Sequence, residues 1–138
     1  SCDGTVQALD LTRGEERWRF VTRGDIWYRP LVADGKLFFG SADLHVYAVD
    51  LASGRESWRF RTGNRALTSV AWWRGLVLAG SYDRHLYALD AANGAPAWSV
   101  RASGAVASPT VSGNQVAFGT ADGLIVVLDL PGGSEADS

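Results

Sequence analysis

Apolar and polar residues alternate in short stretches rich in β-branched and aromatic side chains, and Gly, Asp, Asn and Ser separate these stretches. One 35-residue segment gives four expected strands, at residues 27–33, 36–41, 45–50 and 56–61. Turns are expected at Asp34-Gly35, Ala42-Asp43 and Ser53-Gly54, where glycine or a short polar side chain tolerates positive φ. No stretch carries a sustained helical period, so the pattern predicts an all-β chain.

The four-strand pattern repeats. Asp10, Asp50, Asp90 and Asp129 recur at steps of 40, 40 and 39 residues. The motif A-x-D-x-x-x-G-x-x-x-W occurs three times, at Ala8, Asp10, Gly14 and Trp18, at Ala48, Asp50, Gly54 and Trp58, and at Ala88, Asp90, Gly94 and Trp98. A second shared block precedes later motifs, as in RPLVADGKLFFGSAD and SVAWWRGLVLAGSYD. Four short strands on a repeat of about 40 residues are typical of a β-propeller blade.

Each motif residue has a physical reason to recur. Gly lets the turn between the third and fourth strands close tightly, and Asp accepts backbone N–H groups of that turn. Trp on the outermost strand is expected to lie flat between neighbouring blades, with Ala as a site small enough for the indole to cover. The buried indole N–H then needs an acceptor, most simply a backbone carbonyl.

These residues resemble the tryptophan-docking motif of the pyrroloquinoline-quinone-type (PQQ-like) repeat family, over residues 3–129. WD40 repeats fit less well, because no Trp-Asp dipeptide occurs, and kelch repeats fit less well on period. The resemblance implies an all-β fold of four-stranded antiparallel blades arranged as a β-propeller.

The strand inventory predicts an incomplete propeller in one chain. We expect a partial blade at residues 1–21, complete blades at 26–61 and 66–101, a partial blade at 105–130, and a flexible acidic tail at 131–138. Propellers typically have four to eight blades, and open sheet edges favour aggregation. The sequence therefore predicts that this is the C-terminal segment of a larger protein completed by the rest of its parent chain, or that copies form a homo-oligomer.

Composition narrows the function classes. The 138 residues are 46% hydrophobic and carry a net charge of -2, which argues against a disordered chain and against a nucleic-acid partner bound by bulk charge. No apolar run is long enough for a membrane span. Cys2 is a lone cysteine, so an internal disulfide and a Cys-x-x-Cys metal site are excluded. Twelve arginines stand against the single Lys36, which suggests a GC-rich bacterial source.

An enzyme is disfavoured. The resemblance implies quinoprotein dehydrogenases as the enzyme class to consider, and these enzymes hold PQQ and calcium. Their calcium ligands, catalytic aspartate and adjacent-cysteine disulfide have no match in this sequence. We therefore expect no cofactor, neither PQQ nor calcium, and no catalytic residue. His45 and His85 occupy equivalent repeat positions near Asp43 and Asp83, and we interpret them as strand histidines rather than metal ligands.

Departures from the repeat provide the candidate binding residues. Trp27, Tyr28 and Arg29 begin an inner strand, so we expect them at the channel mouth as a ligand or partner site, or as filling between blades or chains. Trp72, Trp73 and Arg74 form the second candidate, since neighbouring strand residues point to opposite faces and one indole is expected to be exposed. Arginines on the fourth strands form a basic stripe that blunts edge pairing, with a partner site as the alternative. These are Arg17, Arg19, Arg59, Arg61 and Arg101.

The interpretation is a non-catalytic propeller module that binds a protein or peptide partner, or a small ligand. Non-enzymatic PQQ-like repeats imply two settings, the C-terminal sensor or regulatory region of actinobacterial serine/threonine protein kinases and the propeller scaffold lipoprotein of outer-membrane protein assembly. The Arg-rich composition leans toward the kinase setting. A fragment of a PQQ-dependent dehydrogenase remains the enzymatic alternative.

Overall fold

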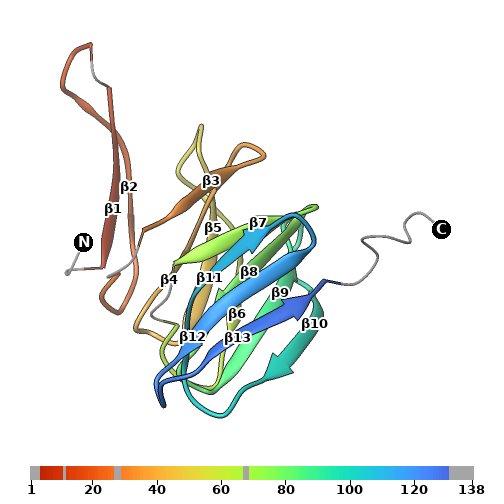
Figure 1. The fold of residues 1–138 in the computed structure, drawn as a ribbon. Coiled ribbons are helices and arrows are strands. Elements are labelled where there is room, and N and C mark those ends of the chain that lie inside the picture. Colours follow the sequence, from red (N-terminus) through yellow and green to blue (C-terminus); the bar gives the residue numbers. More distant parts are fainter. Residues whose placement is uncertain (1–3, 11, 27–28, 67–68, 131–138) are drawn as a thin grey trace.

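The computed structural model describes residues 4–10, 12–26, 29–66 and 69–130 (Figure 1). These residues form β1 (Thr5–Leu9), β2 (Glu16–Val21), β3 (Leu31–Ala33), β4 (Lys36–Gly40), β5 (His45–Asp50), β6 (Glu56–Arg61), β7 (Val70–Trp73), β8 (Leu76–Gly80), β9 (His85–Asp90), β10 (Pro96–Arg101), β11 (Val106–Ser112), β12 (Gln115–Thr120) and β13 (Ile125–Asp129). They make four antiparallel sheets of consecutive strands: sheet 1 (β1-β2), sheet 2 (β3 to β6), sheet 3 (β7 to β10) and sheet 4 (β11 to β13).

The expected strands agree closely with those observed, except at the inner strand of sheet 2. β3 begins at Leu31 rather than at residue 27. Pro30 precedes it and has no N–H to donate to a sheet, and residues 27 and 28 lie outside the described part of the chain. Asp34 and Gly35 adopt positive φ values of 56° and 73°, which confirms the first predicted turn.

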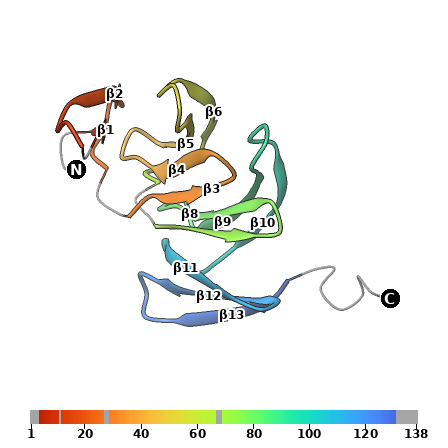
Figure 2. The same ribbon diagram turned by 90° about the horizontal axis from the view of Figure 1, so that it is seen from above.

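The four sheets follow one another in chain order, and each faces the next (Figure 2). The innermost strands β3, β7 and β11 contact one another in succession. Sheets 2, 3 and 4 each run outward from their inner strand through antiparallel neighbours, ending at β6, β10 and β13, whereas sheet 1 holds β1 and β2. The described residues thus form sheets that radiate from a line of inner strands.

Three apolar clusters join the sheets. Sheets 1 and 2 enclose a cluster that includes Phe39 and Val49. Sheets 2 and 3 enclose a second cluster, with Phe38 from β4 and Leu89 from β9. Sheets 3 and 4 enclose a third, which contains Phe118. The middle sheets therefore bury both faces, which explains their nearly continuous apolar strands.

The repeated motif performs the predicted roles. The Asp50 carboxylate accepts the backbone N–H of Ala52 at 2.8 Å, and the Gly54 N–H donates to the Asp50 carbonyl at 2.8 Å. Asp10 and Asp90 close their turns with the same pair of interactions. The aspartates are turn formers, as the repeat indicated.

The motif tryptophans lie between sheets. The Trp18 indole N–H donates to the Leu51 carbonyl of the next sheet at 2.8 Å, and Trp58 donates to the Ala91 carbonyl at 2.9 Å. These bonds span 33 residues each and confirm the predicted backbone acceptor. The Trp98 Nε1 is buried without an acceptor among the described residues, so the predicted bond is not formed at the third motif. The equivalent residue, Leu130, follows Asp129 as Leu51 follows Asp50, and it packs in the same apolar cluster as Trp98.

Sheet 4 leaves one face bare. Ile125 is 76% exposed and Val127 57% exposed, whereas the residues at their repeat positions in sheet 2, Val46 and Ala48, are both 0% exposed. In sheets 2 and 3, the sheet that follows in the chain covers these positions. Within the described residues, no sheet follows sheet 4. The expected tail at 131–138 and Cys2 fall outside the described residues.

Candidate functional site

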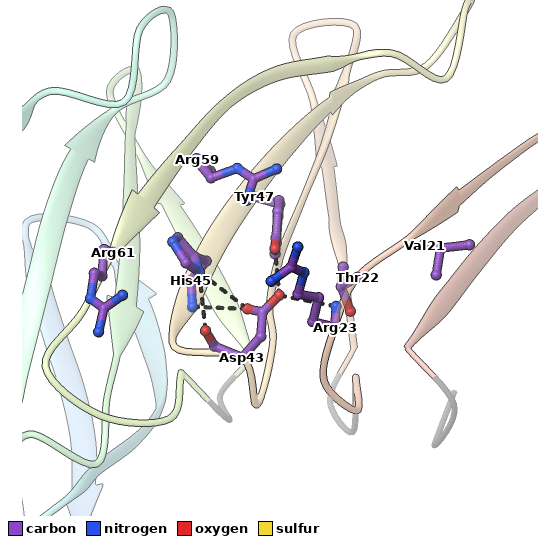
Figure 3. Close-up of a pocket in the computed structure, with 8 residues that line it drawn as sticks. All are labelled: Val21, Thr22, Arg23, Asp43, His45, Tyr47, Arg59 and Arg61. Atoms are coloured by element: carbon purple, nitrogen blue, oxygen red, sulfur yellow. Dashed lines mark hydrogen bonds and ion pairs between the residues drawn. The ribbon is translucent and has the colours of Figure 1, made fainter.

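A cleft of about 440 Å³ opens between sheets 1 and 2, beside the turn that joins β4 to β5 (Figure 3). Its lining comes from the end of β2, the segment that follows it, the β4–β5 turn, and strands β5 and β6. The lining residues are Val21, Thr22, Arg23, Asp43, His45, Tyr47, Arg59 and Arg61. We call this the first cleft.

Asp43 organises the floor of the first cleft. Its carboxylate accepts the Tyr47 hydroxyl, the His45 backbone N–H at 3.1 Å and the Arg23 backbone N–H at 3.3 Å. The His45 ring places Nδ1 3.1 Å from the Asp43 carbonyl oxygen. Burial and then the Asp43 carboxylate raise the pKa of the Tyr47 hydroxyl, which therefore stays a donor at neutral pH.

Arg59 is held rigidly at the rim. Its Nε and one terminal nitrogen donate to the two oxygens of Glu56 at 2.9 and 2.7 Å, a bidentate pair. The guanidinium carbon lies 5.1 Å from the centre of the Tyr47 ring, within cation–π range. The hydrogen bonds that Arg59 donates to Glu56 raise the pKa of Arg59, which keeps its positive charge.

The same framework recurs between sheets 2 and 3, with different charges. Tyr87 donates to Asp83, and Asp83 also accepts the Gly63 N–H at 2.8 Å and the His85 N–H at 3.0 Å. Gly63 occupies the position that Arg23 has one repeat earlier. Ser99 likewise occupies the position of Arg59 one repeat later. The shared Asp–Tyr–His set is therefore structural, and the arginines distinguish the first cleft.

A second hollow of about 440 Å³ lies between sheets 3 and 4, at the same end of the sheets. Tyr82 lines it from the β8–β9 turn and is 40% exposed, and Ala105 and Ala121 line it from sheet 4's segments. This hollow is mainly apolar, whereas the first cleft is mainly polar. The two hollows and Arg29, which precedes β3, share one end of the sheets.

The first predicted site is only partly described. Arg29 is exposed. Trp27 and Tyr28 lie outside the described residues, so their predicted place at the channel mouth stays a prediction.

The expectation of an exposed indole at the second predicted site is wrong. Trp73 is only 8% exposed and packs in the cluster between sheets 3 and 4. Trp72 is half-buried on the opposite face, with its ring 6.1 Å from that of Phe38. The two indoles do point to opposite faces, but sheet 3 has a neighbouring sheet on each face. Arg74 is exposed, with its guanidinium carbon 5.3 Å from the Trp73 ring.

The two predicted sites lie apart. Arg29 precedes an inner strand, whereas Arg74 follows one, at the β7–β8 turn. Equivalent inner strands run in the same direction, so these residues lie at opposite ends of the sheets. A binding role for Trp72, Trp73 and Arg74 stays a prediction.

The described residues do not offer the donor set of a metal site. They contain no group of three or more His, Cys, Asp or Glu side chains that could hold an ion. His45 and His85 each interact with the aspartate of their own sheet. The calcium that accompanies PQQ in quinoproteins therefore finds no matching ligands in the described part of the chain. No helix there is long and apolar enough to cross a membrane.

Residues 2–138 match the family described as outer membrane protein assembly factor BamB. Three solved structures resemble the chain with a TM-score of 0.83 each. BamB from Moraxella catarrhalis is 24% identical over 96% of this chain and 46% of that chain. The computationally designed Ika4 protein is 20% identical over 94% and 82%, and the designed Ika8 protein is 20% identical over 96% and 42%. No curated protein matches the sequence.

These likenesses confirm the predicted fold class, an all-β partial propeller of PQQ-like repeats with four-stranded antiparallel sheets. The chain spans less than half the length of the Moraxella catarrhalis protein.

Proposed function

Because this chain belongs to the family of PQQ-like repeat propellers described as outer membrane protein assembly factor BamB, we propose that it is a non-catalytic module that binds a polypeptide. The observation that carries the proposal is the clustering of two hollows at one end of the sheets. One hollow is rich in arginine and the other is apolar beside the exposed Tyr82. Arginine and tyrosine are enriched among the residues that dominate protein interfaces.

The family description favours a scaffold in outer-membrane protein assembly. In that role the module would hold a partner of the assembly machinery against the end of the sheets that carries the β4–β5 and β8–β9 turns (the lower end in Figure 1). A scaffold needs rigid elements beneath its binding surface. The buried contacts between consecutive sheets provide that rigidity.

A regulatory domain of a bacterial serine/threonine protein kinase is the second candidate role. It is favoured by the composition, in which twelve arginines accompany the single Lys36. Both roles use the same surface to bind a polypeptide. They differ in the parent protein and in the identity of the partner.

Site-specific photo-crosslinking in the native host tests the proposal. A photoreactive amino acid replaces Val21 or Tyr82 at the proposed binding end, and replaces the exposed Arg55 at the opposite end as the control. We expect a discrete crosslinked partner from positions 21 and 82 and none from position 55. A component of outer-membrane assembly in that product supports the scaffold role, and a kinase or its substrate supports the regulatory role. Equal crosslinking from position 55, or none from positions 21 and 82, contradicts the proposed binding end.

A further inference from the structure

The first cleft carries a positive charge that its own carboxylates do not neutralise. Arg23, Arg59 and Arg61 line it, and the carboxylates beside them are those of Asp43 and Glu56. Asp43 is occupied by the Tyr47 hydroxyl and two backbone N–H groups. Glu56 is occupied by Arg59 alone. The cleft is thus locally basic in a chain whose net charge is -2.

Two of the three guanidinium groups have no carboxylate partner. Among the described residues, no ion pair forms to Arg23 or to Arg61. Figure 3 places these two side chains on either side of the Asp43–His45 pair. A ligand that satisfies both arginines must therefore present two separated anionic groups.

The rest of the lining fits an extended peptide. Val21 at the rim is 63% exposed and offers apolar contact beside the charges. The volume of about 440 Å³ exceeds what a single carboxylate fills and accommodates several side chains. Arg59, fixed by Glu56 and by the Tyr47 ring, already shows the bidentate geometry with which guanidinium groups bind carboxylates here.

We propose that the first cleft binds an acidic segment of a partner polypeptide, with two carboxylates seated on Arg23 and Arg61. This inference rests on the proposed polypeptide-binding function and names the chemistry of the partner. The equivalent position between sheets 2 and 3 is the internal comparison, because it keeps the Asp–Tyr–His framework but has Gly63 and Ser99 in place of two arginines. That position is expected to bind acidic peptides weakly.

The chain itself supplies the test variant. The substitution Arg23→Gly gives this position the residue that stands there one repeat later, Gly63, whose N–H donates to Asp83 as the Arg23 N–H donates to Asp43. Binding of a fluorescent hexaglutamate peptide is followed by anisotropy at low salt, with hexaglutamine as the uncharged control peptide. We expect Arg23→Gly and Arg61→Ala each to weaken hexaglutamate binding about tenfold. Added salt is expected to weaken binding to the wild type as well.

Two control variants separate a site from bulk charge. Arg55→Ala removes an exposed arginine at the opposite end, and Arg101→Ala removes the equivalent of Arg61 in sheet 3. We expect both to change hexaglutamate affinity less than about twofold. The inference is overturned if hexaglutamine binds as tightly, if Arg23→Gly leaves affinity unchanged, or if Arg55→Ala weakens it equally. Retained crosslinks from positions 21 and 82 alongside such a result refute the acidic partner and leave the binding end intact.

Discussion

The Trp18 indole of sheet 1 covers Gly54 of sheet 2. A Cβ built on Gly54 would lie only 2.5 Å from Cδ2 of Trp18, so the ring occupies the space where any other residue has its side chain. Gly94 stands in the same relation to Trp58, with a Cβ 2.6 Å from the ring. The motif glycine therefore does two things, closing its own turn and forming the seat for the tryptophan of the preceding sheet.

Removing the ring that joins sheets 2 and 3 should destabilise the fold strongly. Trp58→Ala is expected to lower the free energy of unfolding by about 3–5 kcal/mol, because it empties a buried contact and deletes the N–H bond to the Ala91 carbonyl. Trp58→Phe keeps an aromatic ring and loses only the donor, so its cost should be smaller, about 1–3 kcal/mol. Urea unfolding followed by circular dichroism measures both. A loss below about 1 kcal/mol for Trp58→Ala would show that the contact is not a main source of stability.

A pair of glycine substitutions isolates the indole seat from backbone strain. Gly94 and Gly75 have φ values of 77° and 79°, but no described atom lies within 4 Å of a Cβ on Gly75. Alanine at either position should lower the free energy of unfolding by about 1–2 kcal/mol, because the backbone there is left-handed. Gly94→Ala should cost a further amount of about 1–3 kcal/mol for displacing Trp58. Equal losses in the two variants, measured by the same unfolding assay, would contradict the seat.

Acid should weaken the link between sheets 2 and 3 through Asp83. Burial raises the pKa of Asp83, but hydrogen bonds from Tyr87 and the backbone of Gly63 and His85 together hold it below its usual value. A lowered folded-state pKa contributes stability above the unfolded pKa of about 3.9 and loses it as pH falls through the folded value. Asp83→Asn should therefore lower stability at pH 7 by about 1–2 kcal/mol and flatten the decline below pH of about 4.

The exposed Asp34 is the control for this pH dependence. Asp34→Asn should leave both the stability at pH 7 and its acid dependence nearly unchanged, because the side chain is exposed and asparagine tolerates the positive φ at this position. If Asp83→Asn also retains the full acid dependence of the wild type, Asp83 does not couple the sheets.

The bare face of sheet 4 is expected to drive self-association of the isolated chain. Ile125 and Val127 expose apolar surface that sheets 2 and 3 bury at the same positions. Light scattering should give a mass above the 14.8 kDa of one chain. Ile125→Asp should shift that mass toward one chain, whereas Ser53→Asp at an exposed turn should not. A wild-type chain that stays monomeric at high concentration would contradict this expectation.

The repeat made most of the fold predictable from the sequence. The Asp–Gly spacing located the turns between third and fourth strands, and the alternating pattern gave β5 and β6 with their observed ends. The pattern could not say that sheet 3 has neighbours on both faces. That is why one of Trp72 and Trp73 was expected to be exposed, although the contacts bury or half-bury each.

The first cleft was less accessible to sequence reasoning. Arg23 follows β2 of sheet 1, and Arg59 lies in β6, the outer strand of sheet 2. Their proximity therefore depends on how sheets 1 and 2 face each other. A signal was present in the repeat, since Gly63 and Ser99 replace these arginines one unit later. The interpretation of the fourth-strand arginines as a stripe that blunts edge pairing stays a prediction. The Arg59–Glu56 pair does not account for Arg23 and Arg61.

The clamping of indoles between consecutive sheets is tested most directly by proton NMR of the glycine Hα resonances. Ring currents from Trp18 and Trp58 should shift the Hα signals of Gly54 and Gly94 upfield, with cross-relaxation to the indole protons, because the rings cover these glycines. Gly75, with no described atom within 4 Å of its Cβ position, should show neither effect. Unshifted Gly54 and Gly94 signals without contacts to an indole would contradict the arrangement of successive sheets on which this account depends.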